Sequence, residues 1–371
     1  MALGRLLMKA AIISFLLLSP KNKLDYSPLQ DLENAILIFA RHYLDPGQQA
    51  KFGPIPNPDD PVVALELVGP GPRFLLSMHT ALVEHNGPAF FKAVTDVNSM
   101  LREIKYPVQE DGNLLHPNSI EAVMNLWQHT GIPLQVVHHV LEESYLRCIL
   151  LYGADLRRYR PWSNEVYGEL LPSLVDEIIH LTNLKKHSLF LDLGSGIGHV
   201  VMQACLQTGC RGHGIEISSS VAAIARWMAA IFRQRCHMWG LKFGLFELEE
   251  GDMTTSSLVL DKLRDADVIL VNNKSFDDTL NGKILHLFMN LKDHAHVVSL
   301  LPLSTSLNRR VTERNVDDVG NIFHVEEHWS DPMQVSWSSS VQKYYLYKVD
   351  HAGYSTKLQG FAQAFRDPLR M

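Results

Sequence analysis

The sequence predicts an α/β protein whose parallel, doubly wound sheet follows a helical N-terminal domain. From Leu189 onward, short apolar runs alternate with helical segments of ten or more residues, a pattern typical of parallel sheets. Before residue 150, apolar residues recur at steps of three and four without strand-like alternation. A glycine-rich turn separates the first apolar run of the second half from the helix that follows it. We therefore expect a helical domain over 1–150 and an α/β domain over 151–371.

The composition narrows the class of protein. The chain has 371 residues, of which 46% are apolar and 20% charged, so it can bury a sizeable core and is not a disordered chain. Its formal net charge of −6 excludes a protein that binds nucleic acid through bulk positive charge. The four cysteines form no CxxC pair, so we expect neither a disulfide framework nor a metal site.

The first apolar run, residues 10–18, follows two basic residues and is similar to the core of a signal peptide. It is too short to span a bilayer, and the segment 19–23 that follows is a poor cleavage site. A buried strand with a turn is therefore the favoured interpretation, and a signal peptide is the alternative.

Helix signals dominate the remainder of the first half. Ser27 and Pro28 form an N-cap and first-turn pair, and the apolar periodicity that follows predicts a helix that ends at Asp45-Pro46-Gly47. The proline-rich stretch 45–63 predicts a loop. Further helices are expected at 75–104, 119–130 and 133–152.

The second half alternates regularly. We expect strands at 189–194, 213–217, 243–252, 267–273 and 296–302, helices at 198–208, 218–239 and 279–291, and a closing antiparallel hairpin within 335–349.

The strongest functional signal is the turn Asp192-Leu-Gly194-Ser-Gly196-Ile-Gly198 between a strand and a helix. Dinucleotide-binding turns have the pattern G-x-G-x-x-G, and here its third glycine position holds His199. The observed G-x-G-x-G follows an aspartate, which would repel a pyrophosphate. An aspartate suits a cofactor that carries an ammonium and a sulfonium, so the turn predicts S-adenosylmethionine.

Two further acids stand where strands end. Glu216 closes the second strand, where a carboxylate can bind both hydroxyls of a ribose, and Asp252 follows the third strand and fits the adenine amino group. The carboxyl ends of parallel strands share one edge of the sheet, so these acids should lie close together. The alternative is an α/β domain whose glycine turn binds no ligand.

Four segments together resemble a known family: VYGELLPS (166–173), DLGSGIGHVVMQA (192–204), VILVNN (268–273) and VSW…YY (335–345). They resemble the disruptor-of-telomeric-silencing (Dot-one) family of non-SET histone H3 lysine-79 methyltransferases. The similarity runs from about Tyr152 to Val349 and extends more weakly into 13–29, in the manner of fungal members.

The resemblance implies a seven-strand, Rossmann-like class I S-adenosylmethionine-dependent methyltransferase core. It also implies methyl transfer to lysine 79 of histone H3 in nucleosomes, a nuclear location, and roles in telomeric silencing and the DNA damage checkpoint. Nucleosomal DNA and ubiquitinated histone H2B are further partners that the family implies. No membrane contact is expected.

Carried over by motif, the resemblance also implies roles for individual residues. Tyr167 and Glu169 would lie on a loop that covers the cofactor, while Asp192, Gly194 and Gly196 hold its methionine end. His199 and Met253 would contact the cofactor, together with Glu216 and Asp252. Asn272 would lie beside the donor sulfonium and the incoming amine. Tyr344 and Trp337 would line a lysine channel, with Phe276 nearby. From spacing alone, Asn272 could be a turn amide and the aromatic residues ordinary core.

Several residues depart from the family pattern. His199 replaces the usual Gln or Asn, and Met253 replaces a phenylalanine. Lys274 follows the asparagine pair and would repel a substrate ammonium if it faced the channel. The triplet Ser338-Ser339-Ser340 lacks a glycine that often follows the VSW motif. These changes leave a methyltransferase with another protein acceptor, and a cofactor-binding chromatin module with weak catalysis, as alternatives.

The positive charges are dispersed. Three short clusters could contact DNA: Arg157-Arg158-Tyr159-Arg160, Lys185-Lys186-His187 and Arg309-Arg310. Each is more typical of a solvated surface. The sequence shows no long lysine-rich arm, so we expect weak, salt-sensitive nucleosome binding or a partner that supplies affinity.

Overall fold

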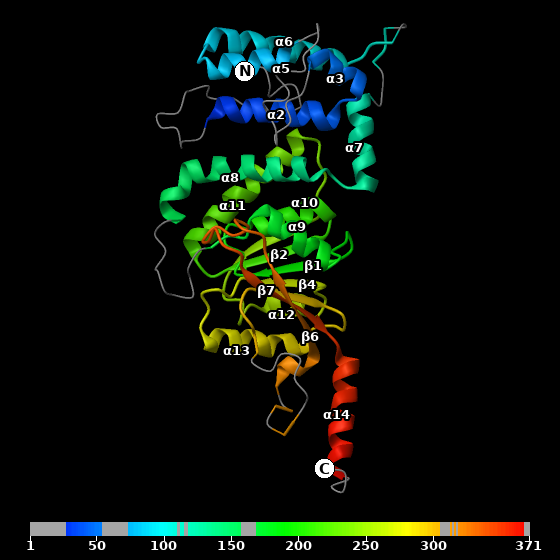
Figure 1. Cartoon of the computed structure of the whole chain (residues 1–371), viewed down its shortest axis with the longest axis vertical. Coiled ribbons are helices and arrows are strands. Elements are labelled where there is room, and N and C mark those ends of the chain that lie inside the picture. The colour runs from blue at the N-terminus through cyan, green and yellow to red at the C-terminus, as the bar shows by residue number, and fades with distance from the viewer. Residues whose placement is uncertain are drawn as a thin grey trace. The chain divides into compact units, whose positions relative to one another are not determined.

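The computed structural model describes residues 27–53, 73–109, 112–114, 118–156, 168–304, 312–313, 315–316 and 318–366. The apolar run at 10–18 lies outside these residues, so the choice between a strand and a signal peptide stays open. Figure 1 shows the chain with its elements labelled. The helices are α2 (Pro28–Tyr43), α3 (Pro46–Phe52), α5 (Phe74–Val83), α6 (Gly87–Lys105), α7 (Ser119–Thr130), α8 (Leu134–Leu156), α9 (Pro172–Leu181), α10 (His199–Thr208), α11 (Ser219–Met238), α12 (Ser257–Leu263), α13 (Asp278–Leu287) and α14 (His351–Arg366), with short 3-10 turns η1 (Phe288–Asn290) and η2 (Val319–Ile322). The strands are β1 (Leu189–Leu193), β2 (Arg211–Glu216), β3 (Phe246–Glu250), β4 (Val268–Val271), β5 (His296–Ser299), β6 (Phe323–Trp329) and β7 (Lys343–Val349).

The chain forms two compact units. The first contains the described residues up to Leu150 together with Ile231–Lys242, and the second contains Leu151–Ala230 with the residues from Phe243 onward. The sequence-based boundary at residue 150 assigned the segment 231–242 to the α/β part, whereas this segment clusters with the helical unit.

The helical unit is organised around an aromatic core. The rings of Phe39 and Tyr43, one turn apart on α2, stack at 4.6 Å between centroids. Tyr43 also meets Trp127 of α7 edge to face at 4.7 Å and lies 5.9 Å from the Trp239 ring. The Tyr43 hydroxyl donates to the Trp239 carbonyl at 2.6 Å, so the polar end of this buried ring is satisfied.

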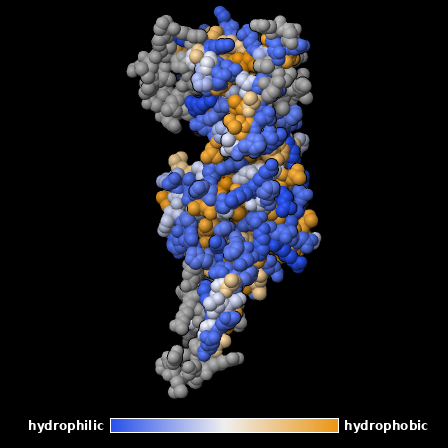
Figure 2. Space-filling model, turned by 90° about the vertical axis from the view of Figure 1, so that its right-hand side faces the viewer, coloured by the Kyte–Doolittle hydropathy of each residue, from blue (hydrophilic) through white to orange (hydrophobic). Residues whose placement is uncertain are grey.

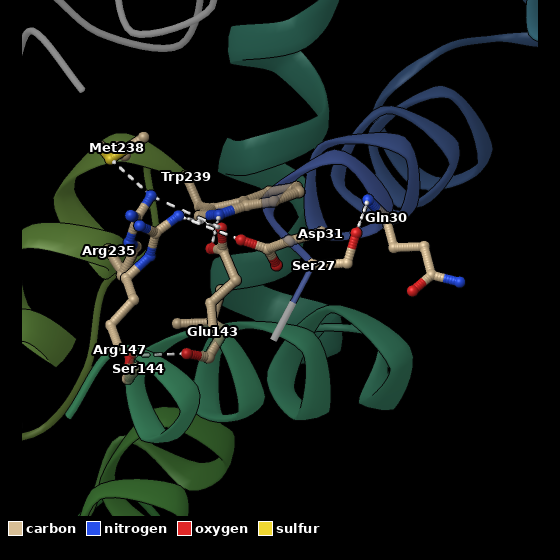
Figure 3. A network of polar contacts seen from close by, with 10 residues as sticks. Ser27, Gln30, Asp31, Glu143, Ser144, Arg147, Arg235, Met238 and Trp239 are labelled. Carbon is tan, nitrogen blue, oxygen red and sulfur yellow. Dashed lines mark hydrogen bonds and ion pairs between the residues drawn. The ribbon is translucent and has the colours of Figure 1, made fainter. Parts of the chain in front are cut away.

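A polar cluster lies beside this core and is drawn in Figure 3. Glu143 of α8 is 1% exposed and accepts a hydrogen bond from the indole N–H of Trp239 at 3.1 Å. Arg235 and Arg147 approach the same carboxylate at 3.5 and 3.8 Å, and Arg147 also pairs with Asp31 of α2 at 3.0 Å. Two acids and two arginines thus balance each other's charge where α2, α8 and the end of α11 meet.

The α/β unit contains a seven-stranded sheet with the order β3-β2-β1-β4-β5-β7-β6. β1 pairs in parallel with β2 and β4, and β7 runs antiparallel to both β5 and β6. In Figure 1, α9 and α10 lie on one side of the sheet and α12 and α13 on the other. All five residues of β1 are buried, as expected for a central strand covered on both faces. The predicted α/β class and the seven-strand core are confirmed.

Three element predictions were wrong in detail. The stretch 45–63 was predicted as a loop, but Asp45 is the N-cap of α3, in a capping box with Gln48. The single helix expected at 75–104 is two helices, because Asn86 caps a new helix at Gly87. The closing hairpin pairs β7 with β6 rather than with residues near 335, because Phe323–Trp329 supplies the partner strand.

In the part of the chain that the structure describes, no helix is both long enough and apolar enough to cross a bilayer. On the face shown in Figure 2, hydrophilic residues predominate and hydrophobic residues form patches between them. The four cysteines are buried free thiols. Among the described residues, no group of three His, Cys, Asp or Glu side chains could hold a metal ion.

Candidate cofactor and active site

A cavity of about 320 Å³ opens at the carboxyl ends of β1, β2 and β4, within the size range of small-molecule sites. The residues that follow these strands line it, together with residues from the starts of α10 and α13. Its lining comprises Gly168, Leu170, Asp192, Gly194, Ser195, Gly196, His199, Val200, Glu216, Ile217, Asp252, Met253, Thr254, Leu270, Asn272, Phe276, Asp277, Thr279, Leu280 and Lys283.

The glycine turn needs its glycines. Gly194, Gly196 and Gly198 have φ values of 92°, 54° and 78°, a region that residues with a Cβ rarely adopt. A Cβ on Gly198 would also lie 2.6 Å from Cδ1 of Leu248 on β3. The turn can therefore pack against β3 and start α10 only with glycine at these positions.

The backbone amides of this turn are largely used within the protein. The N–H groups of Gly194 and Ser195 both donate to the Ile215 carbonyl, and the N–H of Gly198 donates to the Ser195 carbonyl. The Gly196 N–H donates to the Glu216 carboxylate at 3.0 Å. A phosphate-binding turn presents such amides to the ligand, so this turn is not arranged to hold a pyrophosphate.

The acids that the sequence predicts at the strand ends do meet here. Asp192 is 3% exposed. Its burial, together with the nearby Glu216 carboxylate, raises the pKa of Asp192 to about 7. Glu216 also accepts from the Ser218 N–H at 2.8 Å, so its two oxygens fix the turn and the start of α11. Asp252 lines the cavity, and its Oδ1 accepts from the N–H and hydroxyl of Thr254 at 2.7 and 2.8 Å.

Apolar side chains cover one wall. Met253 is buried, and its Cε lies 3.7 Å from the position that a Cβ on Gly194 would occupy. The Phe276 ring reaches 3.5 Å from the same position. A methionine and a phenylalanine thus border the backbone of Gly194, and this wall of the cavity is apolar.

The two asparagines after β4 have different surroundings. Asn272 donates from Nδ2 to the Gly168 carbonyl at 2.9 Å, while its Oδ1 is buried without a hydrogen-bond partner in the structure. Asn273 is fully buried. Its Nδ2 donates to Asn281 and to the Leu301 carbonyl, and its Oδ1 accepts from the N–H groups of Leu300 and Leu301. Asn273 therefore joins β4 to the end of β5, whereas Asn272 keeps an acceptor for a ligand.

Two segments far apart in the sequence pair at the cavity edge, and we call residues 168–171 and 334–337 together the strap. Leu170 and Val335 form an antiparallel bridge, and Leu171 donates to the Gln334 carbonyl at 2.9 Å. Glu169 and Ser336 exchange two further hydrogen bonds. The strap brings together motifs that lie at opposite ends of the family resemblance.

The strap is attached to the cavity wall from two sides. Asn272 holds the Gly168 carbonyl, and Nε2 of His199 donates to the Leu170 carbonyl at 2.9 Å. The proton of His199 is therefore directed to the backbone of the strap and not to the cavity. Trp337 packs behind Gly168 so closely that a Cβ there would lie 2.7 Å from its ring. Neither Trp337 nor Glu169 is among the lining residues.

Tyr344 does not line the cavity, which differs from its predicted place in a lysine channel. Its side chain is buried, its hydroxyl donates to Glu177 of α9 at 2.5 Å, and its ring stacks on His328 of β6. Burial and the neighbouring Glu177 raise the pKa of this hydroxyl. Strand alternation explains the difference, because Tyr345 and Tyr347 point to the core cluster on the opposite face. Tyr167 lies outside the described residues.

The sequence did not indicate the contribution of α13. Asp277, Thr279, Leu280 and Lys283 line the cavity from its first turns. The available signal was the N-cap pattern of Asp277 after β4, which places a helix start at the sheet edge.

Of the departures from the family pattern, His199 and Met253 line the cavity, whereas Lys274 and the serine triplet do not. Lys274 is exposed and is not among the lining residues, so it does not face the site. Ser339 and Ser340 are exposed in the connection before β7. The cluster Lys185-Lys186-His187 is exposed in the loop before β1, at the amino edge of the sheet, opposite the cavity. The other two basic clusters lie outside the described residues.

The charge of the lining decides which ligands fit. Four carboxyl groups, those of Asp192, Glu216, Asp252 and Asp277, face one lysine, Lys283. The buried Asp192 favours its neutral form in the free protein, and a bound cation would restore its charge. Because the turn amides donate to protein groups, they are not available to a phosphate. The acids that line the cavity therefore suit a positively charged ligand and disfavour a phosphate-bearing one. S-adenosylmethionine meets these requirements.

A sequence profile described as "Histone methylation protein DOT1" matches residues 145–349, more than half of the chain. The chain belongs to the DOT1 family. The match covers the strap, the glycine turn and all seven strands, so the cavity is built from the part of the chain that defines the family. The recognition made from the four sequence segments is confirmed.

The chain is similar to curated fungal members of the DOT1 family. It is 30% identical over 352 residues to a protein of Aspergillus fumigatus named "Histone-lysine N-methyltransferase, H3 lysine-79 specific". This alignment covers 94% of the chain and 63% of the Aspergillus protein. A protein of the same name from Yarrowia lipolytica is 33% identical over 228 residues, 62% of this chain and 46% of that protein. The chain thus spans about half to two-thirds of the length of these relatives.

Among solved structures, a putative class I S-adenosylmethionine-dependent methyltransferase of Listeria monocytogenes matches with 14% identity and a TM-score of 0.40. The match covers 75% of this chain and 87% of that one.

Proposed function

We propose that this DOT1-family chain binds S-adenosylmethionine in the cavity and transfers its methyl group to lysine 79 of histone H3 in nucleosomes. The observation that carries the proposal is a cavity lined by acids, next to a glycine turn whose amides donate to protein groups and not to a ligand. The names of the fungal relatives support the acceptor.

The lining suggests which residues hold the cofactor. Asp192, Gly194 and Gly196 would bind its methionine end, and Glu216 its ribose. Asp252 would bind the adenine amino group, with Met253 against the base.

His199 would act through the strap, because its N–H is bonded to Leu170. Glu169 would join the two segments of the strap through its hydrogen bonds with Ser336, and Trp337 would pack against Gly168. Phe276 would border the reacting groups. Tyr344 is left out of this set.

Methyl transfer from S-adenosylmethionine to an amine requires no covalent intermediate with the protein. S-adenosylmethionine, when bound, supplies a methyl group on a positively charged sulfonium. The acceptor lysine must be neutral to attack, and from a pKa of about 10.4 this costs roughly 4.6 kcal/mol at pH 7. An apolar surrounding with Phe276 lowers that cost, and the unpartnered Oδ1 of Asn272 can accept an N–H of the amine and orient it. No general base is required.

The wider assignments rest on the family. We infer a nuclear location and a role in chromatin, with telomeric silencing and the DNA damage checkpoint as settings. Nucleosomal DNA, through clusters such as Lys185-Lys186-His187, and ubiquitinated histone H2B are proposed partners. We also propose that the helical part and the methyltransferase part act as two domains.

Mass spectrometry of reconstituted nucleosomes after incubation with the protein and S-adenosylmethionine tests the proposal. Methylation at lysine 79 of histone H3 is the expected result, and methylation of another protein instead would reassign the acceptor. Calorimetry with S-adenosylhomocysteine separates a third case, in which the chain binds the cofactor product but does not turn over.

The cofactor site has its own test. Glu216→Gln keeps an acceptor for the turn but removes the charge, so we expect the affinity for S-adenosylhomocysteine to fall at least about tenfold. Glu250→Gln, at an exposed acid on neighbouring β3, is the matched control and should leave the affinity unchanged. Equal affinities for the two variants would show that the site lies elsewhere.

A further inference from the structure

Three exposed apolar residues lie at the end of β6 and on its connection to β7, on either side of the strap segment 334–337. Trp329 is 61% exposed, Met333 70% and Val341 45%. Single exposed apolar residues are common, whereas exposed apolar residues that gather on one part of the surface are a feature of interaction sites. We call Trp329, Met333 and Val341 the rim group.

The backbone presents Met333 at some cost. Its φ is 62°, in the left-handed region that favours glycine. The turn is held by Gln334, whose side-chain oxygen accepts from the Asp331 N–H at 2.9 Å. Gln334 is buried and its carbonyl binds Leu171 of the strap. A strained residue with an exposed, large apolar side chain, fixed beside a functional cavity, is a signal of function.

The Trp329 ring is also held in place. The Lys343 ammonium lies 4.9 Å from its centroid and pairs with Glu327 at 2.6 Å. These contacts fix an exposed indole in one orientation before any partner arrives. Pre-ordered aromatic residues are typical anchors of protein interfaces, because little conformational entropy is lost on binding.

We propose that the rim group is a docking surface for the folded protein that carries the acceptor lysine; this rests on the function proposed above. Met333 directly precedes Gln334, the first residue of the strap segment 334–337. The other segment of the strap contains Gly168, which lines the cavity. An extended lysine side chain reaches only about 6 Å beyond its Cα. A protein whose lysine enters the cavity must therefore bring its own backbone to the cavity rim, where the strap and its extension lie. Because the rim group is apolar, it suits contact with a protein surface and not with the charged backbone of DNA.

The test compares nucleosome binding and methylation for variants of the full chain. Trp329→Ser combined with Met333→Ser should weaken nucleosome binding at least about tenfold and raise KM to match, with the affinity for S-adenosylhomocysteine unchanged. Leu245→Ser is the matched control, because it removes an 82% exposed side chain at the amino edge of the sheet. It should leave nucleosome binding as in the wild type.

A second variant guards against misfolding. Met333→Gly removes the side chain but suits the positive φ, so it should keep or raise the thermal stability while weakening nucleosome binding. Unchanged nucleosome binding in Met333→Gly and in the double variant would overturn the docking surface, as would a double variant that loses S-adenosylhomocysteine. If the wild type binds nucleosomes but methylates nothing, the proposed function fails, and the binding comparison still decides the docking surface. A wild type that does not bind nucleosomes overturns both.

Discussion

Asn272 and Asn273 are adjacent in the sequence but differ in what their amides can do. Asn273 uses both amide atoms within the protein, across β4, α13 and the end of β5. Asn272 uses only its nitrogen and keeps a buried oxygen without a partner. The sequence identified the pair as a motif, but the division of tasks depends on hydrogen bonds to residues up to 104 positions away, which no local pattern contains.

Asn272→Ala and Asn273→Ala should therefore separate catalysis from stability. Asn272→Ala is expected to lower kcat by about 10²–10³-fold while sparing the affinity for S-adenosylhomocysteine, because an orienting acceptor is lost. Asn273→Ala should lower the free energy of unfolding by about 1–3 kcal/mol for each buried donor it leaves unpaired. Steady-state kinetics and urea unfolding measure the two effects. The assignment fails if Asn272→Ala destabilises the protein as much as Asn273→Ala does.

Asp192 makes ligand binding depend on pH. Its pKa of about 7 lies above the ordinary 3.8, so the free protein holds this carboxyl protonated in mild acid. In the ligand-free protein, the stability that comes from this raised pKa is present below pH 3.8 and is lost as the pH rises through 7. A ligand that places an ammonium beside Asp192, as the amino acid end of S-adenosylmethionine or S-adenosylhomocysteine would, favours the ionised form and must release the proton. The affinity for such a ligand therefore falls as the pH drops below 7.

We therefore expect the affinity for S-adenosylhomocysteine to decrease by at most tenfold per pH unit between about pH 7 and pH 5.5. Asp192→Asn should bind more weakly at pH 8 and show a flatter profile, because it has no proton to release. Calorimetry in buffers of different ionisation enthalpy would count the proton. An unchanged slope in Asp192→Asn would assign the pH dependence to another group.

At the scale of elements, hydrophobic periodicity and helix-capping residues predicted most helices and strands. The elements that were not predicted depend on pairing between segments that are far apart in the sequence. The alternation of apolar runs with helical segments after Leu189 located the parallel strands, and the central strands β1 and β4 are buried on both faces. Asp45-Pro46 was interpreted as the end of one helix, although the same residues begin α3. The strap escaped prediction because its two segments, 168–171 and 334–337, have no strand-like length and pair only in the folded chain. The sequence shows the alternation of β7, but it does not show which face of β7 meets the cavity, so it could not place Tyr344 relative to the cavity.

The glycine turn predicts a clear pair of substitutions. Gly198→Ala meets both a positive φ and Leu248, and should lower the free energy of unfolding by about 2–4 kcal/mol. Gly282→Ala in α13 meets no atom within 4 Å and should raise it by about 0.5–1 kcal/mol, as glycine disfavours helices. Thermal unfolding of both variants measures this. Adding Leu248→Ala to Gly198→Ala should recover only the part caused by the contact. Full recovery would mean that the backbone conformation imposes no cost.

At the scale of the whole chain, the helical unit is completed by a segment from the second half of the sequence. Residues 231–242 supply Trp239 to the aromatic core and Arg235 to the Glu143 cluster drawn in Figure 3. A boundary placed at residue 150 from the change in hydrophobic pattern leaves this segment out of the helical unit. Apolar periodicity shows that α11 has a buried face, but it does not show which unit buries that face.

The same substitution at two tryptophans, one buried and one exposed, tests whether residues 231–242 belong to the helical core. Trp239 is 2% exposed and donates to the buried Glu143, whereas Trp227, on α11, is 55% exposed. Trp239→Ala should lower the free energy of unfolding by about 3–5 kcal/mol, since it opens a cavity and removes one partner of a buried carboxylate. Trp227→Ala should change it by about 0.5 kcal/mol or less. Urea unfolding followed by circular dichroism makes the comparison, and hydrogen exchange should show the loss of protection in α2 and α8 for Trp239→Ala alone. Equal destabilisation by the two variants would mean that 231–242 is not part of the helical core.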